Sequence, residues 1–207
     1  MIDDLINSLN LIITQTQNNM TVLAVILIIL WGMFLITSLD KNLLYVLGIT
    51  PRHLRGLTGI IFAPLVHLNF NHIFFNSIPL VVLSNFILIN GVYYYLVVTV
   101  LIALLSGICI WCFAKRATHV GASGVITGYW AFLVVNIYQS GSVTTFILGL
   151  LSVYYFAGIF FGIFPQKKGV SWESHLFGLL AGIATSYILR FYPDYFLLPQ
   201  QTVPLYS

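Results

Sequence analysis

Charged residues are scarce in this chain of 207 residues. Only 6% of the residues are Asp, Glu, Lys or Arg, whereas 59% are hydrophobic. An ordinary soluble domain carries about 25% charged residues, which form a polar shell around its core. This chain has too few polar residues to make such a shell. We therefore predict an integral, multi-pass membrane protein surrounded mostly by lipid.

Other features are also missing. No basic run extends beyond a Lys-Arg or Lys-Lys pair, and the net charge is only +3, which excludes a nucleic-acid-binding surface. The N-terminus carries Asp3 and Asp4 where a cleaved signal peptide would be basic, so we expect the first apolar run to remain as an anchor. Cys109 and Cys112 lie inside an apolar run, and we interpret them as packing residues rather than a redox pair.

What the chain does have is six apolar segments, at about 21–39, 60–90, 92–113, 123–138, 143–164 and 173–191. A helix needs about 20 residues to cross a bilayer. The second segment is too long for one straight span, so its first part should be a loop or an interfacial helix. Backbone amides in lipid need partners within the chain, so the spans should be helices. The sequence predicts an all-α membrane protein, a bundle of six transmembrane helices.

Three regions are expected. Apolar residues between 3 and 20 share one helical face, so residues 1–20 are predicted to form an amphipathic segment on the membrane surface. Residues 21–192 should form the six-helix membrane domain, and residues 193–207 a short C-terminal tail.

Four polar residues stand out in the apolar segments: His72, Asn76, Ser123 and His175. Polar groups in membrane segments cost free energy and therefore need a reason to be there. A lone serine is weak evidence, because its hydroxyl often bonds to a carbonyl of its own helix. Histidines are rarer in such segments. His72 and Asn76 are four residues apart, which places them on one helix face.

Pairs of glycines repeat at helical spacing near two of these residues. Small residues four apart let two membrane helices approach closely. The fourth and sixth helices should therefore meet glycine to glycine, which would bring Ser123 and His175 within reach of each other. The glycines are Gly124 with Gly128, and Gly178 with Gly182.

Three motifs together resemble the signatures of rhomboid intramembrane serine proteases. They are GASG (Gly121–Gly124), SHLFGLLAG (Ser174–Gly182) and HLNFNHIFFN (His67–Asn76). They match a G-x-S-G at the head of the fourth helix, an H-x-x-G-x-x-x-G on the sixth and an H-x-x-x-N on the second. The resemblance covers residues 43–190 and implies a serine endopeptidase that cuts transmembrane protein substrates in the bacterial cytoplasmic membrane.

The resemblance also implies roles for the residues. Ser123 would be the nucleophile and His175 its base, and no carboxylate falls on a neighbouring helix to complete a triad, so a dyad is expected. The oxyanion would be stabilised by the Ser123 amide, the Asn76 side chain and the His72 ring. Gly121 would leave the backbone free to adopt the shape this requires. No cofactor and no metal are expected. The fifth helix would be a lateral gate, and residues 164–172 a lid.

The chain departs from the family pattern at several positions. Thr127 stands where some relatives place a tyrosine against the catalytic histidine, which leaves open what holds that ring. Ser174 stands where alanine is common. The loop at 52–62 has no tryptophan. We interpret its charged residues, together with the later His119, as a solvated rim; they are Arg52, His53 and Arg55.

Other functions remain open. A catalytically inactive relative could bind or escort membrane proteins, although such relatives typically lose the serine or the histidine. A transporter would need a charged or ion-binding residue at mid-membrane. A zinc site of His67, His72 and His175 would need a fourth ligand, and five residues on a helix separate His67 from His72 by about 140°. The oligomeric state is not indicated.

Two patterns disagree on orientation. Nearly all the basic residues precede the second, fourth and sixth segments, and the positive-inside rule puts that side in the cytoplasm. The family resemblance implies instead a cytoplasmic N-terminus and a site open to the outside. We follow the resemblance.

Overall fold

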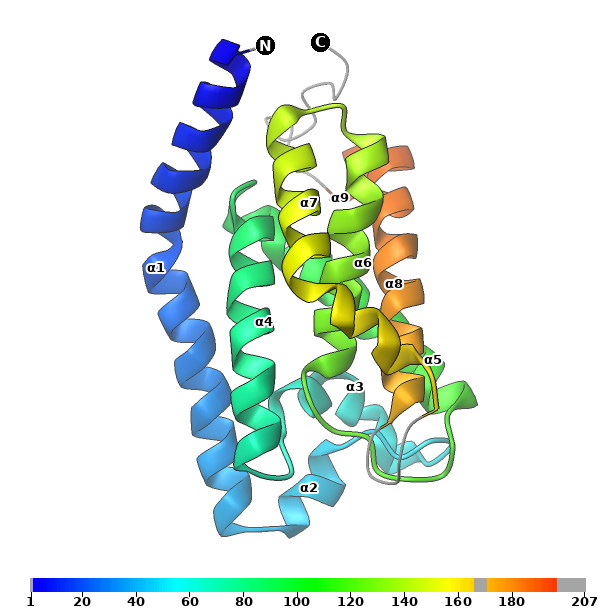
Figure 1. Ribbon diagram of the computed structural model, residues 1–207. Coiled ribbons are helices and arrows are strands. Elements are labelled where there is room, and N and C mark those ends of the chain that lie inside the picture. Colours follow the sequence, from blue (N-terminus) through cyan, green and yellow to red (C-terminus); the bar gives the residue numbers. More distant parts are fainter. Residues whose placement is uncertain (1, 166–170, 197–207) are drawn as a thin grey trace.

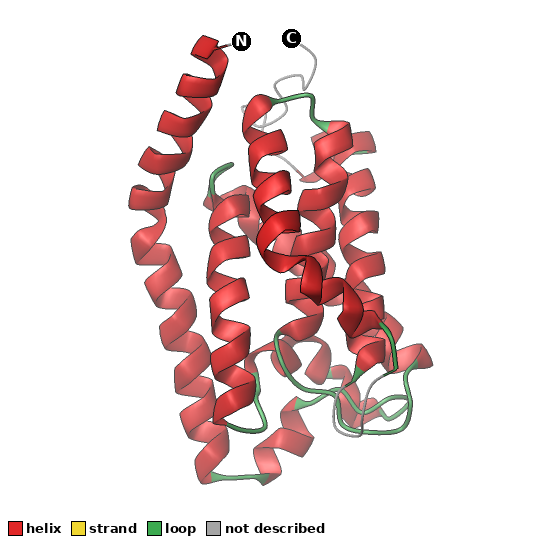
Figure 2. Cartoon of the chain, viewed as in Figure 1, coloured by secondary structure: helices red, strands yellow, loops and turns green. Residues whose placement is uncertain are grey.

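The computed structural model describes residues 2–165 and 171–196. This part of the chain consists of helices and loops (Figure 2), with one isolated antiparallel bridge between Ile49 and His119. The long helices are α1 (Ile2–Leu39), α4 (Phe70–Leu88), α5 (Val92–Phe113), α6 (Ser123–Gln139), α7 (Val143–Phe156), which continues as the 3-10 helix η3 (Ala157–Ile163), and α8 (Trp172–Phe191). The short ones are α2 (Asn42–Leu47), η1 (Leu54–Leu57), α3 (Gly59–Phe62), η2 (Ala63–Leu65) and α9 (Pro193–Phe196).

Four of the described helices are long and apolar enough to cross a membrane, namely α1, α4, α5 and α7 with η3. The predicted all-helical, multi-pass architecture is confirmed at this level. The remaining two long helices are shorter or more polar. α6 has 17 residues, and α8 carries Glu173 in its first turn and Arg190 in its last.

The first helix differs from the predicted division at residue 20. The structure joins residues 2–39 into one helix of 38 residues. Such a helix is about 57 Å long, nearly twice the roughly 30 Å of the hydrocarbon core. Its middle is tied to α4, because Asn85 accepts a hydrogen bond from Asn19 (3.2 Å) and donates one to Thr16 (2.8 Å). The membrane-surface position of residues 1–20 stays a prediction.

The second apolar segment is divided as expected. Its first part forms α3 and η2, and α4 begins only at Phe70. The side chain of Asn69 caps α4 by accepting a hydrogen bond from the backbone N–H of His72 at 2.9 Å. This cap supplies a partner for an N–H group that the first turn of a helix leaves free. It also fixes the turn from which His72 projects.

The centre of the bundle is α6, which lies beside α8 along much of its length (Figure 1). The contact is made by backbone. A side chain added at Gly178 would overlap the carbonyl of Gly124, and one added at Gly182 would overlap the carbonyl of Gly128. The glycine spacing therefore places the two helices as closely as their main chains allow.

The C-terminal region is described only as far as Phe196. α9 covers the start of the predicted tail, and residues 197–207 lie outside the described residues. The predicted lid at 164–172 is likewise only partly described.

Candidate active site

Ser123 is the first residue of α6, and the loop before it takes an unusual shape. Gly121 has φ of +115°, a conformation that glycine adopts without strain. Its backbone N–H donates to the carbonyl of Ala63 at 2.9 Å. A Cβ added at Gly121 would also overlap the His72 ring, because it would lie 2.6 Å from the ring atom Cε1. Gly121 lies before α6 rather than in its glycine contact with α8, and its lack of a side chain leaves room for His72.

His67 holds the same loop from the other side. Its ring is 1% exposed, and its Nε2 accepts a hydrogen bond from the backbone N–H of Ala122 at 3.3 Å. Burial, with a smaller contribution from the neighbouring His72, lowers the pKa of His67 to about 4. The ring is therefore neutral near pH 7 and able to accept. From the sequence, His67 is considered only as a metal ligand, so its role in holding this loop was missed.

His67 and His72 lie close together, and the separation predicted for them from helix geometry is wrong. His67 precedes α4, so helix geometry does not apply to it. The two rings lie edge to face with centroids 4.9 Å apart. In the described part of the chain no three His, Cys, Asp or Glu side chains are grouped in a way that could hold a metal ion. His67 Nε2 is already occupied by the Ala122 amide.

His175 lies in the first turn of α8 and is oriented from η3. Its Nδ1 is 2.9 Å from the backbone carbonyl of Gly162. A carbonyl can only accept, so Nδ1 is assigned the hydrogen and Nε2 is left with a free lone pair. This bond answers what holds the ring in the absence of a tyrosine. Thr127, at the position in question, donates instead to the carbonyl of Ser123 at 2.8 Å.

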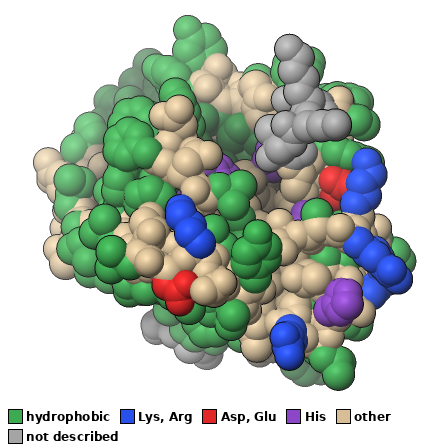
Figure 3. Space-filling model, turned by 90° about the horizontal axis from the view of Figure 1, so that it is seen from below, with side chains coloured by type: hydrophobic (Ala, Val, Ile, Leu, Met, Phe, Trp, Pro, Cys, Tyr) green, Lys and Arg blue, Asp and Glu red, His purple; other side chains and the backbone are tan. Residues whose placement is uncertain are grey.

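One cavity of about 350 Å³ brings the four polar residues together. Ser123, His175, His72 and Asn76 all line it, from the starts of α6, α8 and α4. Seen from below in Figure 3, histidine side chains lie in a hollow of the surface at this end of the bundle. The Asn76 Nδ2 group is buried and has no hydrogen-bond partner among the described residues.

The rim prediction holds for three residues and is wrong for one. Arg52, His53 and Arg55 are exposed. His119 is only 5% exposed and lines the same cavity. Its burial follows from the bridge with Ile49, in which each residue's backbone N–H donates to the other's carbonyl at 2.9 Å. That pairing turns the His119 side chain inward.

Together these groups supply the parts needed for acyl transfer. Ser123 offers a hydroxyl, and Asn76 offers an unused N–H donor. His175 offers the lone pair of Nε2, and the bond from its Nδ1 to Gly162 fixes the orientation of the ring. A nucleophile, an oriented base and a donor around one cavity are the elements by which such sites are recognised.

Comparisons with known proteins agree with the motifs. The sequence pattern of the rhomboid domain matches residues 54–191. An uncharacterized protein of Mycobacterium bovis and one of Mycobacterium tuberculosis are each 37% identical to this chain over 164 residues, which is 75% of this chain and 68% of the relative. An uncharacterized protein of Mycobacterium leprae is 32% identical over 162 residues, covering 73% of this chain and 62% of the relative.

Proposed function

The chain belongs to the rhomboid family, and on that premise we propose that it is an intramembrane serine protease. It hydrolyses peptide bonds in or near transmembrane segments of membrane-protein substrates. The observation that carries the proposal is the bond from His175 to the Gly162 carbonyl, which leaves Nε2 free as a base at the cavity that Ser123 also lines.

The reaction follows from these groups. Ser123 Oγ attacks the scissile carbonyl carbon while its proton moves to His175 Nε2. The tetrahedral intermediate then breaks the C–N bond, and the leaving amine takes the proton from His175. A water molecule, deprotonated by the same nitrogen, then attacks the acyl-enzyme. Collapse of this second intermediate breaks the C–O bond to Ser123 and releases the acid, while His175 returns its proton to Ser123 Oγ. The Gly162 carbonyl supports the positive charge that His175 carries in between.

The negative charge on the intermediate needs donors already in place. Asn76 Nδ2 is one, because it is buried beside the cavity without a partner. The N–H of Ser123 is another, since the first N–H groups of a helix have no partner within it. His72 lines the same cavity and would be a third. Removing a single donor of this kind lowers kcat by about 100- to 1,000-fold.

The membrane arrangement is part of the proposal. We place α6 and α8 across the bilayer together with the four longer spans, which makes six. α6 lies at the centre of the bundle, where other helices rather than lipid surround most of it, so its shorter length is tolerated. α7 with η3 would be the lateral gate. A helical substrate must unwind before Ser123 can reach its backbone, so helix-weakening residues near the cut are expected.

We place the protein in the bacterial cytoplasmic membrane with its N-terminus inside and the site open to the outside. A labelling test needs exposed positions on both sides of the membrane, which excludes the buried Gln139. Ser142 and Ala117 are exposed at opposite ends of α6 and serve instead. In a variant without Cys109 and Cys112, an impermeant thiol reagent on intact cells should label cysteine at 117 and spare cysteine at 142. The reverse pattern would invert the orientation.

The function itself is tested with a fluorophosphonate probe on the purified protein. Ser123 should be labelled, and labelling should disappear in Ser123→Ala and fall sharply in His175→Ala. A wild-type protein that binds a transmembrane segment but neither cleaves it nor reacts with the probe would instead be the inactive, escorting kind of relative.

A further inference from the structure

A second buried histidine, which the proposed mechanism does not use, stands at the wall of the cavity. His119 lies in the loop between α5 and α6, four residues before Ser123. Its backbone is fixed by the bridge to Ile49, so its side chain projects from a rigid point. Both ring nitrogens have partners. A buried imidazole with both nitrogens bonded holds its neighbours in place.

The bonds have a single consistent direction. Nε2 lies 3.0 Å from the carbonyl of Lys115, which can only accept, so Nε2 carries the hydrogen. Nδ1 is then an acceptor, and the hydroxyl of Ser171 donates to it at 2.7 Å. Ser171 Oγ in turn accepts the backbone N–H of Ser174 at 3.3 Å and lies 2.9 Å from the hydroxyl of Ser174. This series of hydrogen bonds therefore connects the end of α5 to the first turn of α8.

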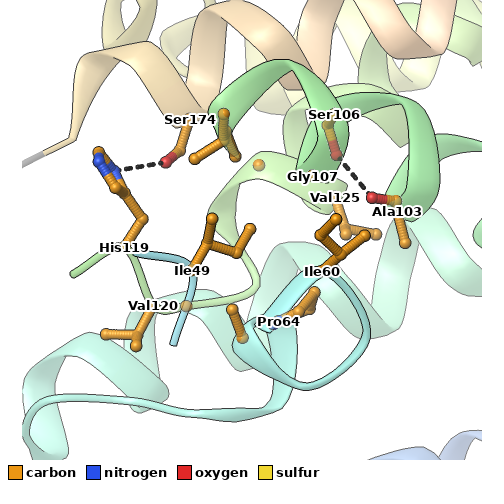
Figure 4. Close-up of a pocket in the computed structure, with 14 residues that line it drawn as sticks. Ile49, Ile60, Pro64, Ala103, Ser106, Gly107, His119, Val120, Val125 and Ser174 are labelled. Carbon is orange, nitrogen blue, oxygen red and sulfur yellow. Dashed lines mark hydrogen bonds between the residues drawn. The ribbon is translucent and has the colours of Figure 1, made fainter. Parts of the chain in front are cut away.

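The far end of this series of bonds reaches the base. Ser171 is the N-cap of α8, and Ser174 immediately precedes His175. Ser174 also lies within 3.5 Å of His119 Nδ1, as Figure 4 shows. The carbonyl of Ser174 is the group that a side chain at Gly124, next to Ser123, would meet at 3.0 Å. The three polar residues therefore connect the loop before the nucleophile to the turn that carries the base.

Resting on the proposed function, we propose that His119 is a positioning residue for the Ser123–His175 pair. It acts through Ser171, holding the first turn of α8, and with it the His175 ring, against the loop that leads to Ser123. It does not touch the reacting atoms. Losing it should lower kcat by about 10- to 100-fold, the effect of displacing a reacting group by a fraction of an ångström to 1 Å, and should leave KM within about two-fold.

The test uses the full chain in liposomes with a transmembrane substrate. His119→Leu removes both bonds at similar volume. His119→Asn keeps an acceptor oxygen where Nδ1 stands, and His119→Gln keeps only a donor near Nε2. We expect the Asn variant to retain most of kcat, and the Gln and Leu variants to show the fall of about 10- to 100-fold. Equal activity of Leu and wild type, or Gln more active than Asn, would overturn the proposal. If the Leu variant does not fold, the comparison of kcat between the Asn and Gln variants still tests the proposal.

A double-variant cycle tests whether His119 acts through Ser171. Because both belong to one series of bonds, His119→Leu with Ser171→Ala should be no worse than the poorer single variant. Additive losses would overturn the proposal. Ser186→Ala is the matched control. Ser186 is a buried, hydrogen-bonded serine near the other end of α8, and its partners are Asn136 and Gln139 on α6. It should combine additively with His119→Leu.

Failure of the proposal and failure of the proposed function give different results. If wild-type Ser123 does not react with a fluorophosphonate, the function is wrong, and the same double cycle measured by thermal unfolding still tests the contact. If wild-type Ser123 reacts and His119→Leu reacts at the same rate, the function stands and the positioning role is wrong. Labelling of Ser171 would make His119 a base for a second nucleophile and overturn the proposal.

Discussion

The two walls around His175, the α6–α8 pair and the α7–η3 segment, are built in opposite ways. On one side, α6 and α8 meet through glycines, and ten of the 17 residues of α6 are buried. On the other side, α7 has three buried residues among 14 and η3 has none, while Tyr154 and Phe161 are 80% and 66% exposed. A segment with few buried contacts opens at lower cost than a packed one. The α6–α8 side therefore sets the geometry, and we expect the α7–η3 side to open at the lower cost.

His175 belongs to both sides. It follows Ser174, whose carbonyl is part of the tight α6–α8 contact, and its ring is oriented by a carbonyl from η3. The spacing between base and nucleophile is thus fixed by one wall and the direction of the base by the other. Variants that affect one wall at a time separate the two contributions.

Removing the reacting groups should have the largest effect and sets the scale for the rest. Ser123→Ala and His175→Ala should each lower kcat by about 10,000-fold or more, because nucleophile and base act as a unit. Both variants should unfold within a few degrees of wild type in a thermal melt. Near-normal cleavage by either variant would remove the dyad from the mechanism.

Asn76→Ala should come next, since it removes one oxyanion donor and leaves both walls intact. We expect kcat to fall by about 100- to 1,000-fold with little change in KM. Initial rates over a range of substrate concentrations separate the two constants. An effect confined to KM would make Asn76 a group that binds the substrate.

The tight wall is broken with one methyl group. Gly178→Ala places a Cβ against the Gly124 carbonyl and should push α8 away, costing about 1–3 kcal/mol of stability and about 100-fold in kcat. The matched control is Gly158→Ala on η3, where an added Cβ has no heavy atom within 4 Å. Thermal melts and cleavage rates should show a loss only for Gly178→Ala. Equal losses at both positions would remove the contrast between the walls.

Gly162→Ala tests the orienting bond on the looser wall. The added Cβ would overlap the His175 ring near Nδ1, so the carbonyl and the ring must move apart. We expect a fall of about 10- to 100-fold in kcat, comparable to loss of an orienting partner elsewhere, with a smaller loss of stability than in Gly178→Ala. A loss of stability without loss of kcat would show that the ring needs no partner from η3.

Side-chain periodicity and motif spacing predicted the framework of the site. The segment at 92–113 coincides with α5, and the glycine pairs on α6 and α8 face each other as their spacing indicates. These features are visible in a sequence because they depend on residue type. The candidate dyad and oxyanion residues, known from motifs, line one cavity for the same reason.

The features that sequence analysis missed depend on backbone atoms and on distant segments. The partner of His175 is a backbone carbonyl, which every residue has, so the sequence around Gly162 gives no sign of this hydrogen bond. The sequence alone places His119 in the solvated rim, yet the bridge to Ile49 turns it inward. The bond that ties the middle of α1 to α4 joins Asn19 to Asn85, 66 residues away in the chain.

The glycine contact between α6 and α8 also determines what kind of error the site tolerates. Where two helices meet through large side chains, their separation varies as those side chains change rotamer. Here carbonyl oxygens of one helix lie against Cα atoms of the other, and neither has a rotamer to change. The separation of Ser123 and His175 is therefore insulated from side-chain motion elsewhere in the bundle, and substitutions on the faces of both helices that point away from this contact can accumulate without altering it.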